Sequence, residues 1–244
     1  MQYRNKVHNM ASFRKEILGQ IERIDTGRIF TFRDLSFETE KTANVAVLLS
    51  EQSRKGVLVR VEKGAYYRPK KSVLGQGKLP VYQDEQFRYL TEKLNGYITG
   101  AYVYNKMGLT EQVATTITIA TPNPVRRFRF KNLDIECVKA YCMDYPDESL
   151  VPYLRLLDAI KDMKRIPGTT GQDIYNRVKS QYFNGYSLPE LEKIVSLAKS
   201  YPPRVRKVVA DILGDIRQTV LQTEMAKTLL PTTRFNMNYQ VYKT

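Results

Sequence analysis

Cysteine and histidine are nearly absent from this chain of 244 residues, which contains two cysteines and one histidine. The thiols of Cys137 and Cys142 and the imidazole of His8 do not supply the four ligands of a structural zinc site. A single histidine near the N-terminus also excludes a catalytic triad built on histidine. So few cysteines in a chain of this length indicate a reducing compartment.

Long apolar runs are missing as well. The first ten residues, MQYRNKVHNM, lack the apolar centre of a signal peptide. No later run approaches the roughly 20 apolar residues that a membrane-spanning helix needs. We therefore expect a cytoplasmic protein with no membrane partner. A hydrophobic content of 42% and a charged content of 26% are globular values, and the length suits two domains.

Acidic residues are outnumbered by basic ones, and the net charge of +14 favours a polyanionic partner. Residues 1–71 carry 15 Lys and Arg against 8 Asp and Glu. Residues 72–146 carry 9 against 7, and residues 147–244 carry 15 against 10. The shortest of the three segments therefore has the largest excess of positive charge, which favours a nucleic-acid site near the N-terminus.

Residues 42–69 show the clearest local pattern, a helix followed by a turn and a two-stranded ribbon. Helical spacing predicts a stripe buried on one side of the helix, formed by Val45, Leu48, Leu49 and Gln52. Thr42 or Asn44 can cap its first turn, and Gly56 can end it in a left-handed conformation. Gly64 suits the turn between the strands VLVRV and AYYR.

A second helix is predicted upstream, over residues 12–24, and a short element follows over residues 31–37. The order helix, short helix, helix and hairpin is that of a winged helix-turn-helix, whose later helix enters the DNA major groove. Residues 1–11 are expected to form a frayed, basic arm. The alternative interpretation is a small α+β unit that binds no ligand.

The candidate DNA-binding residues occupy three places in this motif: the short element, the two ends of the reading helix, and the wing. Side chains at the start of the helix can meet base edges or phosphates, and a phosphate can also meet backbone N–H groups at the start of the short element. In chain order the candidates are Arg33; Lys41, Thr42 and Asn44; Arg54 and Lys55; and Arg60, Lys63 and Arg68.

The rest of the chain predicts an α+β protein in which the winged helix is followed by a mixed α/β segment and a helical C-terminal part. A stretch rich in Gly, Pro and Lys predicts a linker over residues 72–80, between a DNA-binding domain of residues 1–71 and a domain of residues 81–244. In that second domain we expect helices over 84–94 and 97–107, strands over 115–120, 126–131 and 133–141, and helices from residue 149 onward.

Basic residues alternate with phenylalanine in RRFRFK, residues 126–131. This alternation is typical of a nucleic-acid ribbon. It is also typical of a half-buried strand with one solvated face, and we favour that interpretation.

A carboxylate pair is the one enzyme-like feature. Asp158 and Asp162 are four residues apart and share a helix face, as a magnesium site would need. The interleaved Lys161, Lys164 and Arg165 favour an ordinary solvated face instead. We therefore expect a protein that is not an enzyme and that uses no metal or cofactor.

Three blocks of the sequence resemble the AbiEi-like antitoxin family of abortive-infection toxin–antitoxin systems. They are LLSEQSRKGVLVRVEKGAYYRP (48–69), YITGAYVYNKMGLTEQVATTITIATPNPVRRFRF (97–130) and SYPPRVRKVVADIL (200–213), and the resemblance covers roughly residues 12–216. It implies an N-terminal winged helix that binds its own promoter, and a C-terminal domain that antagonises a nucleotidyltransferase-like toxin. DNA binding would fall on residues 42–55 and 60–68. No motif marks a toxin-facing surface, and the tail beyond Ile216 has no counterpart.

Two functions fit these observations. The first is a DNA-binding antitoxin that represses its own promoter and neutralises a nucleotidyltransferase-like toxin. The second is a stand-alone winged-helix transcriptional regulator whose C-terminal domain dimerises or senses a ligand. A third, an interaction module whose basic face binds an acidic protein, is weaker. The resemblance beyond residue 72 favours the antitoxin, with double-stranded promoter DNA and the toxin as partners and the oligomeric state open.

Overall fold

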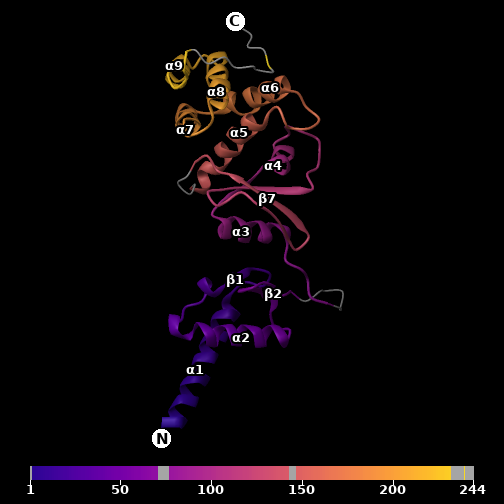
Figure 1. Ribbon diagram of the computed structural model, residues 1–244, viewed down its shortest axis with the longest axis vertical. Helices are drawn as coiled ribbons and strands as arrows, with labels where there is room; N and C mark the ends of the chain where they lie inside the picture. The colour runs from indigo at the N-terminus through magenta and orange to yellow at the C-terminus, as the bar shows by residue number, and fades with distance from the viewer. Residues whose placement is uncertain (1, 71–76, 143–146, 232–238, 240–244) are drawn as a thin grey trace. The chain divides into compact units, whose positions relative to one another are not determined.

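The computed structural model describes residues 2–70, 77–142, 147–231 and 239 (Figure 1). The chain divides into two compact units, residues 1–90 and residues 91–244. Each unit contains helices and one small sheet, so the predicted α+β class is confirmed. The expected linker over residues 72–80 stays a prediction, because residues 71–76 lie outside the described part.

The N-terminal unit has the predicted order of helix, short helical element, helix and hairpin. Its elements are α1 (Gln2–Arg23), β1 (Ile29–Thr31), the 3-10 turns η1 (Phe32–Asp34) and η2 (Thr39–Lys41), α2 (Thr42–Arg54), β2 (Val59–Glu62) and β3 (Ala65–Tyr67). The three strands pair antiparallel in the order β1-β3-β2. The expectation of a frayed arm is wrong for residues 2–11, which continue the helix α1.

The buried stripe of α2 is confirmed: its buried residues are Val45, Leu48, Leu49 and Gln52. It packs on a core that includes Ile17 and Ile21 of α1 and Phe30 of β1. Burying a leucine or isoleucine side chain stabilises a fold by about 1.5–3 kcal/mol, so this contact fixes α2 against the brace helix α1. The opposite side of α2 is thereby left toward solvent.

Both ends of α2 depend on local conformation. Gly56 and Gly64 have φ values of +76° and +81°, as the helix end and the hairpin turn require. The expected caps are wrong: the residue before α2 is Lys41, and Thr42 donates its hydroxyl back to the Thr39 carbonyl oxygen at 2.5 Å. The cause is η2, which leads directly into α2, so Lys41 before the helix lacks the extended conformation that a side-chain cap needs.

The start of α3 (Gln83–Leu94) closes the free edge of β1. Glu85 accepts a hydrogen bond from the Ile29 amide at 2.6 Å, and Arg88 donates to the Ile29 carbonyl oxygen at 2.8 Å. Glu85 and Arg88 also pair with each other at 2.6 Å. Because an unpaired strand edge invites pairing with other chains, this ion pair protects the sheet.

The C-terminal unit contains a mixed sheet of four strands. They are β4 (Tyr97–Thr99), β5 (Thr116–Thr121), β6 (Arg127–Phe130) and β7 (Leu133–Lys139), in the order β4-β5-β7-β6 with β5 and β7 parallel. The helix expected over residues 97–107 is wrong for its first part. Residues 97–99 form a buried strand that pairs with β5, and α4 (Ala101–Lys106) begins only after Gly100, whose φ is +74°.

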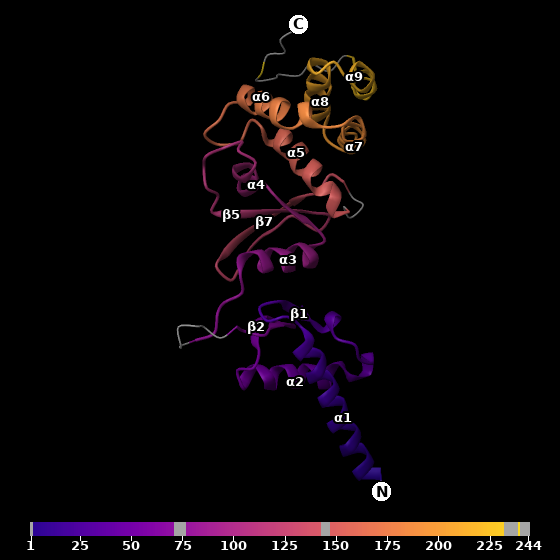
Figure 2. The same cartoon turned by 180° about the vertical axis from the view of Figure 1, so that it is seen from behind.

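Helices follow one another from residue 148 to residue 226, as predicted for the chain from residue 149 onward. After the 3-10 turn η3 (Glu148–Leu150) come α5 (Val151–Asp162), α6 (Gly171–Gln181), η4 (Phe183–Gly185), α7 (Leu188–Ala198), α8 (Pro203–Asp215) and α9 (Thr219–Ala226). The helix α5 is central, since it contacts β4, α6, α7 and α8 (Figure 2). The predicted capping box at the start of α7 is present, with Ser187 and Glu190 bonded to each other's backbone. No helix of the described residues is long and apolar enough to cross a membrane.

The solvated face expected for the carboxylate pair is wrong for Asp158, whose side chain is 1% exposed. Three hydroxyl groups donate to its carboxylate, from Tyr97 at 2.9 Å, Thr99 at 2.8 Å and Tyr201 at 3.2 Å. The Lys161 ammonium lies 3.5 Å away. Asp158 therefore joins β4, α5 and the segment before α8 inside the C-terminal unit.

Candidate nucleic-acid interface

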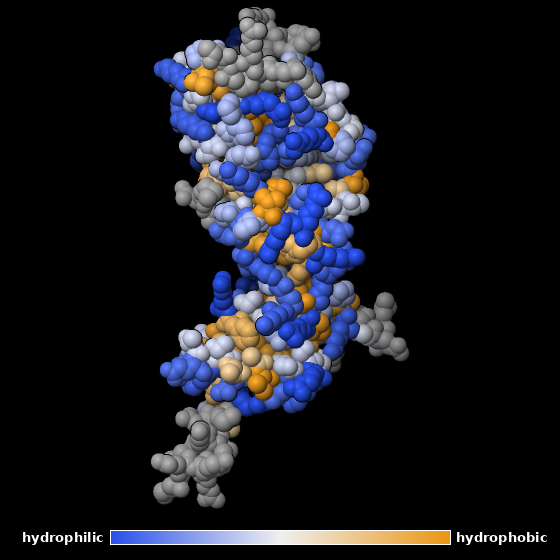
Figure 3. Space-filling view, viewed as in Figure 1, coloured by the Kyte–Doolittle hydropathy of each residue, from blue (hydrophilic) through white to orange (hydrophobic). Residues whose placement is uncertain are grey.

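The exposed side of α2 is the natural candidate for a nucleic-acid interface. Opposite the buried stripe, the exposed residues are Thr42, Ala43, Asn44, Val47 and Arg54. Val47 is 54% exposed. The face shown in Figure 3 has a hydrophobic area over α2 with hydrophilic residues on both sides. A helix surface that combines polar and apolar side chains suits the major groove. There, Asn or Gln side chains can hydrogen-bond to adenine, and apolar side chains can contact the thymine methyl group.

Ala43 and Val47 were absent from the sequence-based candidates, because apolar residues in a helix are usually assigned to the core. The signal that could have found Val47 is its position, two residues after Val45 and one before Leu48, off the buried stripe. A large apolar side chain off the buried stripe of an amphipathic helix is expected to be exposed.

A carboxylate also lies on α2, and its charge is compensated. Glu51 follows Val47 by one helical turn and pairs with the guanidinium of Arg14 from α1. The hydrogen bond from Arg14 lowers the pKa of Glu51, so the carboxylate is ionised at neutral pH. The pair limits the repulsion that a lone carboxylate would exert on a phosphate backbone.

At the start of α2 the three candidates differ. Lys41 lies 2.8 Å from the Glu38 carboxylate and 5.0 Å from the centre of the Phe13 ring, so its charge is partly compensated. Thr42 uses its hydroxyl within the η2 turn. Asn44 is exposed in the first turn of α2. Of the three, Asn44 is therefore the best placed to read a base.

The backbone N–H groups near Arg33 are less open to a phosphate than expected. The Arg33 amide donates to the Thr31 hydroxyl at 3.2 Å, and the Asp34 carboxylate accepts from the Thr31 amide at 2.7 Å. In this capping box the Thr31 and Arg33 amides already have acceptors, and the Asp34 carboxylate places a negative charge beside them. The side chain of Arg33 is exposed and is the part that can meet a phosphate.

The wing presents two exposed cations. Arg60 lies on β2, where its Nε donates to the Glu62 carbonyl oxygen at 3.2 Å, and Lys63 lies in the turn. Arg68 has a structural role instead: its Nη1 donates to the carbonyl oxygens of Glu22 at 2.5 Å and Ile24 at 2.8 Å. It therefore ties the end of the hairpin to the end of α1.

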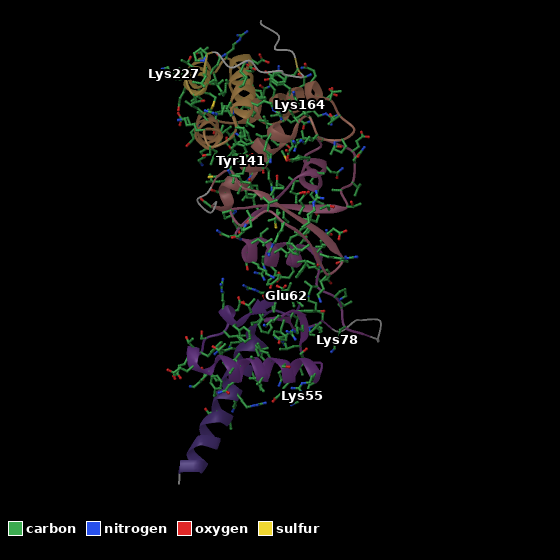
Figure 4. All side chains as sticks on the ribbon, viewed as in Figure 1. Lys55, Glu62, Lys78, Tyr141, Lys164 and Lys227 are labelled. Carbon is green, nitrogen blue, oxygen red and sulfur yellow. The ribbon has the colours of Figure 1, made fainter. Side chains whose placement is uncertain are left out.

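The C-terminal end of α2 carries more positive charge than the candidates suggest. Arg54 and Lys55 are both exposed there. A Cβ atom on Gly56 would stand 2.7 Å from the Lys78 ammonium, so Lys78 lies directly over this end. Figure 4 labels Lys55 and Lys78 on the N-terminal unit. Lys78 belongs to a segment predicted as linker, which is why sequence reasoning did not place it here.

The second basic stretch, RRFRFK, forms the half-buried strand that we favoured. Phe130 is buried, and Arg127 and Arg129 are exposed. Arg127 pairs with Glu136 of β7 at 2.5 Å, and Arg129 lies 4.0 Å from Asp134 of the same strand. Because both arginines of β6 face a carboxylate, this strand offers a phosphate backbone little uncompensated charge.

Comparisons with known proteins identify no relative by sequence. No protein-family model matches the chain, and no curated protein matches it. Among solved structures, the chain is similar to the RV2827C protein from Mycobacterium tuberculosis at 14% sequence identity and a TM-score of 0.39. The match covers 89% of this chain and 81% of that one. A similarity of this size assigns no function.

Proposed function

We propose that this protein is a cytoplasmic, DNA-binding antitoxin that represses its own promoter and neutralises a nucleotidyltransferase-like toxin. The observation that carries the DNA-binding part is the exposed side of α2, where Asn44 and Val47 lie between cations at both ends. An α-helix fits the major groove of B-DNA, and its first turns meet base edges. The protein acts by binding rather than by catalysis.

The charges divide into two roles under this proposal. Arg54, Lys55, Arg60, Lys63 and Arg33 are exposed and contact phosphates, which gives affinity without sequence preference. Asn44 and Val47 contact base edges and give the preference for the operator. Arg54 and Lys55 lie at the C-terminal end of α2, Arg60 and Lys63 on the wing and Arg33 in η1, so phosphates would be met from more than one element of this unit.

The antitoxin part is supported by the sequence blocks that follow the winged helix. The blocks at residues 97–130 and 200–213 resemble the AbiEi-like antitoxin family and lie in the second compact unit. A unit with its own core can bind a partner protein while the N-terminal unit is on DNA. The competing proposal is a stand-alone regulator with a ligand-sensing C-terminal domain, and the observation that favours it is a basic cleft in that unit.

Co-expression tests the antitoxin proposal. The product of the adjacent gene is induced alone and together with the full chain, and growth is followed in both cultures. We expect a growth defect from that product alone and rescue by this protein. A defect without rescue, or no defect, contradicts the antitoxin proposal and leaves the regulator.

Replacing Asn44 by alanine is expected to reduce the preference for the operator over random duplex by about tenfold, because one good base contact is worth about 1–3 kcal/mol. Affinity for random duplex should change by less than about twofold, since Asn44 carries no charge. The operator is first selected from a randomised duplex pool, and both affinities are then measured by fluorescence anisotropy. Thr26→Ala, an exposed polar residue in the turn after α1, is the control. Equal losses on both DNAs would remove Asn44 from base reading.

A further inference from the structure

The C-terminal unit contains a cleft of about 660 Å³ that the DNA-binding proposal does not use. It is lined by the end of α5, the end of β7, the start of α8 and parts of β4, α4 and β5. Four of its lining side chains are cations, and two are carboxylates. The residues that matter here are Lys139, Tyr141, Lys161, Asp162, Arg165 and Arg204.

Lys161 and Arg204 are held in place in this cleft. The Lys161 side chain is 18% exposed and lies 3.5 Å from both Asp158 and Asp162. Asp162 also accepts a hydrogen bond from the Tyr104 hydroxyl at 2.8 Å. Arg204 donates to the Lys161 carbonyl oxygen at 2.5 Å, which fixes its guanidinium at the end of α5. Side chains that are already ordered lose little conformational entropy when a ligand binds.

The other two cations lie at more open positions. Lys139 and Arg165 are exposed, and the Lys139 ammonium lies 5.6 Å from the centre of the Tyr141 ring. The Lys161 ammonium is also 5.6 Å from that ring. Tyr141 itself stacks on Tyr201 at 4.9 Å between ring centres. The cleft therefore has two cations held by neighbouring groups, Lys161 and Arg204, and two exposed ones, and two of the four lie near the Tyr141 ring.

We propose that this cleft binds a phosphorylated small molecule with at least two negative charges. The three oxygens of a phosphate can accept from several cationic donors, and the four cations line one cleft from different elements. Charge-assisted hydrogen bonds are the strong ones. The volume lies within the range of small-molecule sites and is sufficient for a mononucleotide. A metal cation is disfavoured, because Lys161 already lies between the two carboxylates of α5. The inference stands on the C-terminal unit alone and does not rest on DNA or toxin binding.

Titration calorimetry on the full chain tests this proposal, with inorganic pyrophosphate, ATP and adenosine as probes at about 0.15 M salt. We expect pyrophosphate, ATP or both to bind with a dissociation constant below about 1 mM and adenosine not to bind. Tighter binding of ATP than of pyrophosphate means that the ring of the ligand adds contacts, and equal binding means that the phosphates suffice. Failure of both phosphorylated probes overturns the proposal.

The matched variants are Lys139→Ala/Arg165→Ala in the cleft and Lys193→Ala/Lys227→Ala on α7 and at the end of α9. Each pair removes two positive charges, and all four positions are exposed. We expect the cleft pair to weaken probe binding at least tenfold and the control to change it less than twofold. Figure 4 shows that Lys227 lies away from Tyr141, which lines the cleft, within the same unit. Equal binding by wild type and the cleft pair overturns the proposal, as does full displacement of the probe by a short DNA duplex, which would make the cleft part of a nucleic-acid surface. DNA affinity and growth rescue, measured on the same variants, report separately on the proposed function.

Discussion

Reversing Arg60 and Lys63 together to glutamate is expected to weaken duplex binding on the order of 100-fold near 0.15 M salt. Both side chains are exposed on the wing, and the Nε of Arg60 donates to the Glu62 carbonyl oxygen. Each reversal removes one phosphate contact and adds a repulsive charge, at a cost of about 1.4 kcal/mol or more, which is tenfold per residue. The loss should be the same for operator and random duplex, because phosphates carry no sequence.

The salt dependence gives the sharper readout. Each lost phosphate contact lowers the slope of log K against log salt by about 0.9, so the double variant should lose nearly two units of slope. Anisotropy titrations at several salt concentrations measure this. The matched control is Lys193→Glu/Lys227→Glu in the C-terminal unit, which changes the net charge equally at two exposed positions. If the control loses as much affinity and slope as the wing variant, the wing has no specific place in the interface.

Replacing Asp158 by alanine is expected to destabilise the C-terminal unit by about 3 kcal/mol or more. The change leaves the hydroxyl groups of Tyr97, Thr99 and Tyr201 without their shared acceptor and removes the carboxylate beside Lys161. Uncompensated buried polar groups and charges are among the largest single causes of instability. Urea unfolding followed by circular dichroism measures the loss. Asp134→Ala, at an exposed carboxylate on β7, should cost less than about 0.5 kcal/mol.

The same residue makes stability depend on pH. Burial raises the pKa of Asp158 above its ordinary value, against the opposing effect of Lys161. A carboxyl group with a raised pKa in the folded state contributes stability at low pH, and that contribution is lost as pH rises through the folded pKa. Wild type should therefore gain stability relative to Asp158→Asn as pH falls from that raised pKa toward the ordinary value near 4. A difference between the two proteins that is flat with pH would contradict the raised pKa.

The local features of the fold could be predicted from the sequence. The stripe from Val45 to Gln52, the turns at Gly56 and Gly64, and the capping box at Ser187 each depend on residues within one or two turns of each other. The strands β1 and β4 could not be predicted. Each has three residues, as β3 does, but β3 follows its partner β2 across a two-residue turn, whereas β1 and β4 pair with strands much further along the chain. Ile29 pairs with Tyr67, and Ile98 pairs with Ile119.

In the candidate site, too, exposure could be predicted from local position, whereas roles that depend on distant partners could not. Asn44, Arg54, Lys55, Arg60 and Lys63 are exposed, as positions in a winged helix predict. The structural role of Arg68 depends on the carbonyl groups of Glu22 and Ile24, more than forty residues away. The place of Lys78 depends on Gly56, more than twenty residues away. Asp158 is the clearest case, since two of its three hydroxyl donors lie about sixty residues earlier in the chain. Spacing within one helix carries no information about such partners.

The strand order of the C-terminal sheet has a consequence for biosynthesis. The strand β7 lies between β5 and β6, although both are made before it. As the chain leaves the ribosome, β4 and β5 can pair early. One edge of β5 and the strand β6 have no partner until residues 133–139, which form β7, have been synthesised. An exposed strand edge is where nascent chains pair wrongly with one another. The rate of elongation between residues 121 and 139 therefore sets how long this nascent chain is vulnerable.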